Sequence, residues 1–263
     1  MTPSSPDGPH SAAAIESKQE AVRLYQYQPP KRSAGRKALI WIISILVVLV
    51  ALDFGAKAFA ENEAASQIQK QGFPKKPDVS IAGFPFLTQV ITRNFHSVTI
   101  SSSDIPEGPI KITSLNVVAQ NVKLHSNFQS GTAGPLNGTL LISLGAIGGF
   151  LSDAGPLAGF LGGGSNGGLK VVAVGGNELK ANLNLVGGVV NASAVWQVTS
   201  AGPHSIRLRL VRSNGLPSGL LNSARNITIP LKSLPAGLTL TGKLSSNSGG
   251  IIAHVFAKSL SFG

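Results

Sequence analysis

Cysteine is absent from this 263-residue chain, which excludes disulfide bonds, thiolate metal sites, a cysteine nucleophile and a lipid-modified cysteine anchor. Carboxylates are scarce as well, with 11 Asp and Glu residues against 22 Lys and Arg. Charged residues make up 13% of the chain, which is low for a soluble domain. A surface of this composition is rich in Ser, Thr, Asn and Gly.

Catalytic and metal-binding patterns are correspondingly weak. Asp104 and Glu107 lie beside Pro106 in an expected turn, and no histidine has metal-ligand spacing to another histidine or a carboxylate. Gly162–Gly167 formally contains both a dinucleotide-binding and a nucleophile-elbow pattern, but each motif needs a strand before it and a helix after it. We therefore expect no catalytic residue, no metal and no cofactor, with a hydrolase as the weaker alternative.

The longest charge-free run is the most informative segment that is present. Ala38–Leu52 contains 15 apolar or small residues and follows Lys31, Arg32, Arg36 and Lys37. Crossing a bilayer core about 30 Å thick takes roughly 20 helical residues, so a membrane helix must continue past Asp53. Phe54–Ala60 supplies this continuation, because the long side chain of Lys57 can reach the headgroups.

The basic residues before the run predict its orientation. They should stay on the cytoplasmic side, which places the later residues outside the membrane. A cleaved signal peptide is a second interpretation, with Ala58–Ala60 as a small-x-small cleavage site, although a leader of 37 residues is long. A buried core helix is the third. The predicted organisation is a disordered basic cytoplasmic tail (1–37), a transmembrane signal-anchor (38–60) and an extracytoplasmic α+β domain (61–263).

Hydrophobic periodicity changes along the chain. Residues 53–71 have a helical pattern that Gly72 and Pro74 end, so we expect an amphipathic continuation of the membrane helix. Beyond Pro77 the period drops to two, which predicts strands separated by turns. The predicted fold is α+β, with the helix packed on a large curved antiparallel sheet that can enclose a lipid cavity. The predicted strands lie near 79–81, 98–100, 112–124, 136–144, 169–174, 179–185, 192–198, 206–211, 227–231, 238–240 and 251–262.

Two segments interrupt the strand pattern. Phe86–Asn94 predicts a short helix with Leu87, Val90 and Ile91 on one side. Leu144–Leu161 is apolar but rich in glycine, which favours a mobile flap or a pair of short helices.

Positive charge is concentrated toward the end of the sequence. The chain carries a net charge of +11, and no carboxylate follows Glu178. This asymmetry favours anionic partners. Nucleic acid is disfavoured by the outward topology and by the lack of interleaved aromatics, so anionic lipid headgroups or acidic envelope polymers fit better. A basic surface that only maintains solubility is the alternative.

The most distinctive motif is Gly83-Phe84-Pro85-Phe86-Leu87-Thr88-Gln89, which lies between a predicted strand and a predicted short helix. Proline restricts itself and the residue before it, so the motif predicts a rigid corner with two aromatic rings. Such a corner either closes the end of the core or forms the mouth of an apolar cavity, or a wedge into lipid.

The order of these features is similar to that of the LmeA family of actinobacterial cell-envelope proteins. The resemblance covers roughly residues 36–263 and rests on the basic flank, the apolar run, the motif above, Phe95-His96-Ser97-Val98 and Leu234-Pro235-Ala236-Gly237-Leu238. It implies an exported, non-catalytic protein that binds anionic phospholipid, such as phosphatidylinositol, and supports envelope lipid or lipoglycan assembly.

Lipid binding also suits the residues themselves, because each buried methylene of an acyl chain contributes about 0.8 kcal/mol. A headgroup phosphate needs Arg or Lys, although alternation places Arg207 and Arg209 on the outer face of their strand. A scaffolding protein that recruits an envelope glycosyltransferase or another membrane enzyme is the rival function. The predicted lipid-binding residues are Phe84, Pro85, Phe86, Leu87, Phe150, Leu157, Phe160, Arg207, Arg209 and Arg212.

Overall fold

A computed structural model describes residues 34–70, 73–108, 110–154, 169–185, 190–231, 234 and 237–263. These residues belong to two compact units, which meet in the sequence between Ala51 and Leu52. The strands all lie in the second unit, together with the last part of the long helix, and this combination confirms the α+β class. Most of the predicted tail, residues 1–33, lies outside the described residues.

The N-terminal element is a single helix, α2 (Ala34–Lys70), which joins the predicted membrane segment to the predicted amphipathic segment without a break. Residues 39–70 are long and apolar enough to cross a membrane. From Leu52 onward, small side chains such as Ala56, Ala60 and Ala65 face the core of the second unit. The Glu61 carboxylate accepts a hydrogen bond from the backbone N–H of Ile81 at 2.7 Å, so the helix covers a donor of an edge strand.

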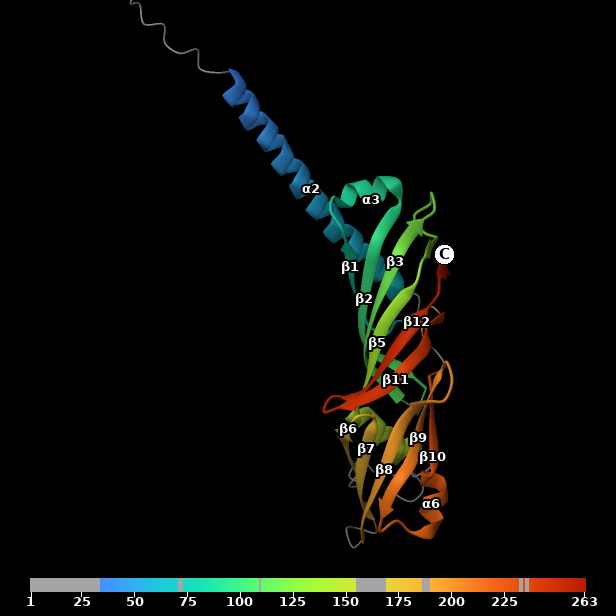
Figure 1. Ribbon diagram of the computed structural model, residues 1–263. Helices are drawn as coiled ribbons and strands as arrows, with labels where there is room; N and C mark the ends of the chain where they lie inside the picture. The colour runs from blue at the N-terminus through green and yellow to red at the C-terminus, as the bar shows by residue number, and fades with distance from the viewer. Residues whose placement is uncertain are drawn as a thin grey trace, which may run out of the picture. The chain divides into compact units, whose positions relative to one another are not determined.

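The first sheet is antiparallel and has the strand order β1-β2-β3-β5-β12-β11, with β4 and β13 paired beside the end of β3 (Figure 1). Alternate side chains of these strands face one apolar core, as the period of two predicts. The strands are β1 (Asp78–Ala82), β2 (Asn94–Glu107), β3 (Ile110–Leu124), β4 (Gly131–Ala133), β5 (Leu136–Ser143), β11 (Thr239–Asn247), β12 (Gly250–Ala257) and β13 (Leu260–Phe262).

The second sheet is a five-stranded antiparallel meander with the order β10-β9-β8-β7-β6. Ser246 of β11 joins it to the first sheet, because its N–H donates to the carbonyl of Gly176 at 2.9 Å. The strands are β6 (Leu169–Gly175), β7 (Glu178–Leu185), β8 (Val190–Ser200), β9 (Ser205–Asn214) and β10 (Asn226–Pro230).

The prediction of one large curved sheet is therefore wrong. The predicted segments all overlap strands, but these strands form two open sheets. Neither sheet is closed over the described residues, since β1 and β11 are separate edges of the first and β6 and β10 of the second. An enclosed lipid cavity is not shown. The period of two identifies the buried face of each strand, but it does not say which sheet the strand joins.

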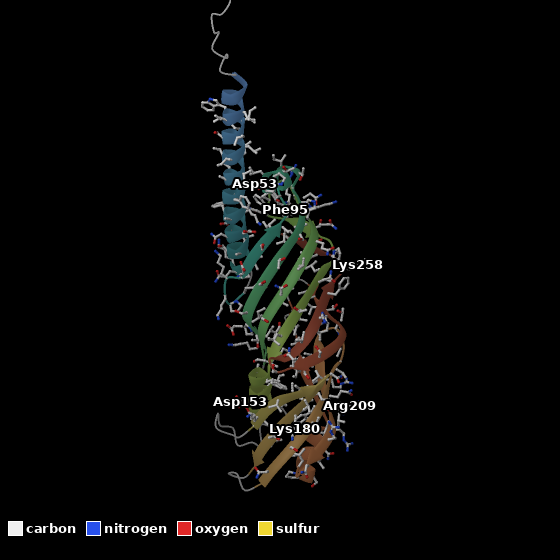
Figure 2. The ribbon with its side chains drawn as sticks, turned by 60° about the vertical axis from the view of Figure 1, so that its left-hand side comes forward. Asp53, Phe95, Asp153, Lys180, Arg209 and Lys258 are labelled. Atoms are coloured by element: carbon white, nitrogen blue, oxygen red, sulfur yellow. The ribbon has the colours of Figure 1, made fainter. Side chains whose placement is uncertain are left out.

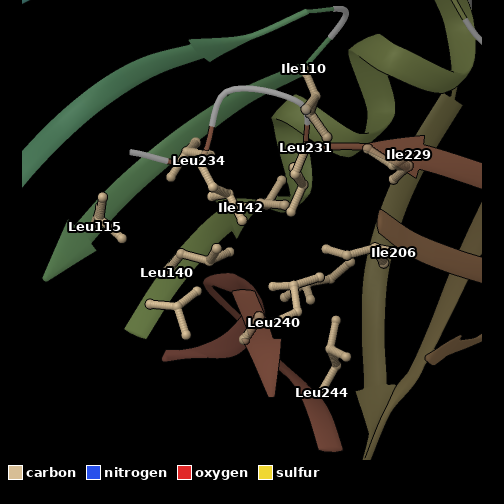
Figure 3. Packing of buried hydrophobic residues seen from close by; sticks show 14 of the residues in the cluster. Ile110, Leu115, Leu140, Ile142, Ile206, Ile229, Leu231, Leu234, Leu240 and Leu244 are labelled. Atoms are coloured by element: carbon tan, nitrogen blue, oxygen red, sulfur yellow. The ribbon is translucent and has the colours of Figure 1, made fainter. Parts of the chain in front are cut away.

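One apolar cluster nevertheless runs through both sheets. Figure 3 shows side chains from different strands meeting at the junction, among them Ile142, Ile206 and Leu240. In the second sheet Trp196 is buried, and its indole N–H donates to the carbonyl of Ala224 at 2.7 Å. Side chains of both sheets thus contribute to one apolar cluster at their junction (Figure 3).

Short helices connect the strands. The predicted helix after Pro85 is confirmed as α3 (Phe86–Thr92), which ends where Arg93 adopts a left-handed conformation with φ of 53°. The predicted pair of short helices is confirmed over residues 144–154 as α4 (Leu144–Gly149) and the π-helix η1 (Phe150–Ala154). The rest of that segment, 155–161, lies outside the described residues. A further helix, α6 (Ser218–Ala224), precedes β10.

Candidate functional site

The corner before α3 points its two phenylalanines in opposite directions. Phe84 is 64% exposed, whereas Phe86 is 2% exposed and packs against Phe95 with ring centroids 6.1 Å apart. Gly83 has a φ of +106°, and a Cβ there would lie 2.7 Å from Nε2 of Gln89. A residue with a side chain would be strained at this φ, so glycine suits the turn that precedes the two rings. We call residues 83–91 the α3 corner.

Asp53 of α2 holds the α3 corner in place. Its side chain is 4% exposed, and its two carboxylate oxygens accept hydrogen bonds from the backbone N–H groups of Phe86 at 2.8 Å and Leu87 at 2.7 Å. The first N–H groups of a helix have no partner within the helix, and Pro85 offers no side-chain cap. Asp53 therefore caps a helix that begins 33 residues later in the chain.

Further contacts fix the same corner. The rings of Phe54 and Phe84 stack with centroids 6.2 Å apart and an interplanar angle of 27°. Gln89 is buried, and its side-chain oxygen accepts a hydrogen bond from the backbone N–H of His96 in β2 at 3.1 Å. The corner is thus attached to α2 on one side and to the first sheet on the other.

Apolar side chains gather on the surface around this corner. Ile91 is 80% exposed and Leu87, one helical turn earlier, is 37% exposed. Phe54 of α2, which stacks on Phe84, is also exposed. We define the apolar end of the second unit as Phe54, Phe84, Leu87 and Ile91.

The structure separates the predicted acyl-contact residues into two groups. Phe84, Pro85 and Leu87 are exposed, whereas Phe86 and Phe150 are buried in the core. Leu157 and Phe160 lie outside the described residues.

The predicted headgroup residues lie on the solvent face of the second sheet, which we call the basic face. Arg207 and Arg209 are exposed on β9, while the neighbouring Ile206 and Leu208 are fully buried. Arg209 donates to the side-chain oxygen of Gln197 at 2.6 Å, and Arg212 forms an ion pair with Glu178, also at 2.6 Å. Lys180, on β7, belongs to the same sheet and pairs in register with Val195. Arg212 is already neutralised by Glu178, so Arg207 and Arg209 are better placed to bind an anion.

The apolar end and the basic face lie at different ends of the second unit. In Figure 2, Asp53 and Phe95 lie at one end of the first sheet, whereas Lys180 and Arg209 lie on the second sheet. Cross-strand pairing puts the Ser246 junction level with Asp104 of β2, and the ten residue-to-residue steps from Asn94 to Asp104 span about 33 Å. A phospholipid is about 20 Å long, half the thickness of a bilayer. Phe84 of the α3 corner and the arginines of the basic face are therefore too far apart to contact the two ends of one such molecule.

Comparison with protein families decides the class of the chain. The model of a family described as LmeA-like phospholipid-binding matches residues 51–256. The chain belongs to the LmeA-like family. The matched region begins two residues before Asp53 and includes the second sheet and all of the first sheet except β13 and the last residue of β12, so the LmeA-like domain takes in the last part of α2. Neither the curated proteins nor the solved structures yield a match.

The LmeA-like family is described by phospholipid binding, and not by a reaction. Among the described residues, no group of three histidine or carboxylate side chains could hold a metal ion. Two of the histidines have ordinary polar contacts, since His96 bonds to Gln89 and His125 to Ser130. The glycine-rich segment Gly162–Gly167 lies outside the described part of the chain.

Asp53 is the residue of the candidate site that sequence reasoning missed. In the sequence it is a charge that interrupts an apolar run. Its partners are backbone N–H groups on another element, and no residue spacing reveals such a contact. The only signal is the cost of an unpaired carboxylate in an apolar helix, which implies a buried partner somewhere else in the fold.

Proposed function

We propose that the chain is an extracytoplasmic protein, anchored in the membrane by α2, that binds anionic phospholipid and supports envelope lipid or lipoglycan assembly. The family match carries this proposal, because it covers the domain and also the end of the membrane helix. The apolar end offers exposed surface for acyl chains, and the basic face offers cations for phosphate groups.

The contacts of Asp53 support retention of the anchor. Cleavage after Ala60 would remove Asp53 and Phe54, and with them the cap of α3 and the ring stacked on Phe84. The folded domain would then lose contacts made by residues of its own leader, so a cleaved signal peptide is the poorer interpretation. Intact mass of the protein isolated from membranes tests this point. We expect Asp53 to be retained, and a mature N-terminus at Glu61 would contradict retention.

In this proposal, the exposed residues of the motif contact the acyl chains. Phe84 and Leu87 present apolar surface to the outside, with Pro85 between them in the sequence, whereas Phe86 and Phe150 support the site from within the core. Leu157 and Phe160 remain predicted acyl contacts. Arg207 and Arg209 form a separate contact for anionic lipid, with Arg212 as a weaker participant because of its ion pair.

Mass spectrometry of bound lipid tests the function directly. Residues 52–263 form a compact unit that contains Asp53, so this fragment can be purified without detergent and extracted with organic solvent. We expect stoichiometric anionic phospholipid in the extract. A fragment that is folded but free of lipid would overturn lipid binding and favour a scaffold that recruits a membrane enzyme.

A further inference from the structure

The exposed apolar side chains of the second unit are unevenly distributed. Ile91 and Phe84 are among the most exposed, at 80% and 64%, and both belong to the apolar end. On the second sheet, the described large apolar residues with comparable exposure are Val174 and Val211. A concentration of exposed aromatic and branched side chains around one short helix marks a contact surface.

The length of the apolar run identifies the surface that this end contacts. As a helix, Ala38–Leu52 is about 22 Å long, which is about 8 Å short of a bilayer core. About five further residues are needed, so the span reaches the neighbourhood of Lys57. Asp53 and Phe54 then lie near the boundary of the hydrocarbon core.

The contacts of Asp53 and Phe54 bring the α3 corner to the same depth. A carboxylate at this depth is costly unless the protein satisfies it, and Asp53 is buried with two N–H donors from α3. Phe54 stacks on Phe84, so the exposed ring of the corner lies beside the end of the span. Ile91 and Leu87 extend the same apolar surface along α3.

We infer that the α3 corner inserts into the bilayer leaflet next to the domain, with Phe84, Leu87 and Ile91 in the interfacial region. This inference rests on the proposed anchoring by α2. The corner lies beside the end of the span, and it places the domain where an acyl chain can pass from the leaflet to the protein. The occupant of the apolar end is therefore lipid, and not another protein.

Spin labels test the insertion, and the natural absence of cysteine makes single-site labelling straightforward. The variants are Ile91→Cys in α3, Val174→Cys on the exposed second sheet and Val47→Cys within the apolar run. Each full-length variant is labelled and reconstituted in phosphatidylcholine vesicles. Its accessibility to oxygen, which partitions into lipid, is compared with its accessibility to a water-soluble nickel chelate.

We expect oxygen to exceed the nickel chelate at Ile91 and Val47, and the reverse at Val174. If the label at Val47 is in lipid while the label at Ile91 is as accessible to the nickel chelate as that at Val174, the inferred insertion of the corner is wrong. The proposed anchoring by α2 is then still supported. If Val47 itself reports water, the anchor fails and the inference fails with it. Because Ile91 and Val174 are both exposed, labelling at either site should leave the fold unchanged, which circular dichroism verifies.

Discussion

The α3 corner and the basic face differ in which side chains they bury and which they expose. Around α3 the surface is apolar, and polar groups such as the carboxylate of Asp53 and the side-chain oxygen of Gln89 are buried and hydrogen-bonded. On the second sheet the arrangement is the ordinary one, with Arg207 and Arg209 outside and Ile206 and Leu208 inside. A surface that hides its polar groups and exposes its aromatic rings is suited to lipid, whereas a surface of exposed arginines is suited to anions in water.

The two regions also differ in how they are built. Each strand of the second sheet pairs with its neighbour in sequence, so its surface follows from local alternation alone. The α3 corner needs α2, because its helix cap and its stacked ring come from residues about 30 positions earlier. Damage to α2 should therefore affect the apolar end and leave the basic face unchanged.

The largest expected effect is on the free energy of unfolding, and it differs between the two phenylalanines of the motif. Phe86→Ser should lower the free energy of unfolding by about 3–5 kcal/mol, because it removes a buried ring packed on Phe95. Phe84→Ser should cost only about 0.5–1 kcal/mol through the lost stacking on Phe54. Denaturant unfolding followed by the fluorescence of buried Trp196 measures both values.

The same pair tests the proposed acyl contact. Phe84→Ser should reduce the phospholipid bound by the 52–263 fragment while its unfolding curve stays near that of the parent. Val211→Ser is a matched control, since it removes an exposed apolar side chain from the second sheet. An unchanged lipid content in Phe84→Ser would remove Phe84 from the site, whatever the stability of the variant.

Loss of the cap on α3 should be the next largest effect. Asp53→Ala leaves the N–H groups of Phe86 and Leu87 without acceptors, and each unpaired buried donor costs about 1–3 kcal/mol. We expect a destabilisation of about 2–4 kcal/mol in thermal or denaturant unfolding of the full chain in mild detergent. Asp53→Asn, which keeps one acceptor oxygen, should lose less.

Glu63→Ala is the control for this experiment, because Glu63 is an exposed carboxylate on the same helix that accepts a bond only from Gln67 among the described contacts. Its effect should stay within about 0.5 kcal/mol. Equal effects of the two alanine variants would show that the bonds of Asp53 add nothing beyond helix propensity.

Substitutions on the basic face should weaken binding of anionic vesicles and leave the stability of the fold almost unchanged. The double variant Arg207→Gln/Arg209→Gln removes two exposed charges, each worth about 1 kcal/mol near an anionic membrane. Full-length protein in neutral nanodiscs should therefore bind anionic vesicles about 25-fold less tightly than the parent in a flotation assay. Higher salt should reduce the difference, because exposed charges are screened.

Lys123→Gln/Lys258→Gln supplies the matched control, since it removes the same charge from exposed positions on and next to the first sheet. It should leave binding of the vesicles nearly unchanged. An equal loss in both double variants would mean that net charge matters and that the basic face has no special role.

The basic face could be read from the sequence because every step of that prediction is local. Alternation of Ile206, Arg207, Leu208 and Arg209 identifies the buried side of β9, and the absence of carboxylates after Glu178 gives the sign of the charge. The division of the strands into two sheets could not be read in the same way. It depends on long-range pairing, since β11 and β12 join β5 in the first sheet although the whole second sheet lies between them in the sequence.

The α3 corner was predicted only in outline. Proline at position 85 and glycine at position 83 indicate a rigid turn, and the turn is present. Which ring points outward depends on the side chain of Gln89 beneath Gly83 and on Phe95 across the core. The role of Asp53 depends on a tertiary contact with α3, so the sequence shows an anomalous charge without showing its partner.

The smallest predicted effect concerns Asp104, which lies on β2 about midway between the two regions. Its carboxylate bonds to Lys75 and lies 3.6 Å from Lys111, and these contacts, chiefly that with Lys75, lower its pKa below the ordinary value of 3.8. A carboxyl group with a lower pKa in the folded state stabilises the fold above about pH 4, and this contribution is lost as the pH falls through the folded-state pKa. Asp104→Asn keeps a residue that tolerates the φ of 57° at this position. The melting temperature of this variant should therefore lie slightly below that of the parent at pH 7, and the gap should close near pH 2. A gap that persists unchanged at low pH would show that the ion pairs of Asp104 do not stabilise the strand between the apolar end and the basic face.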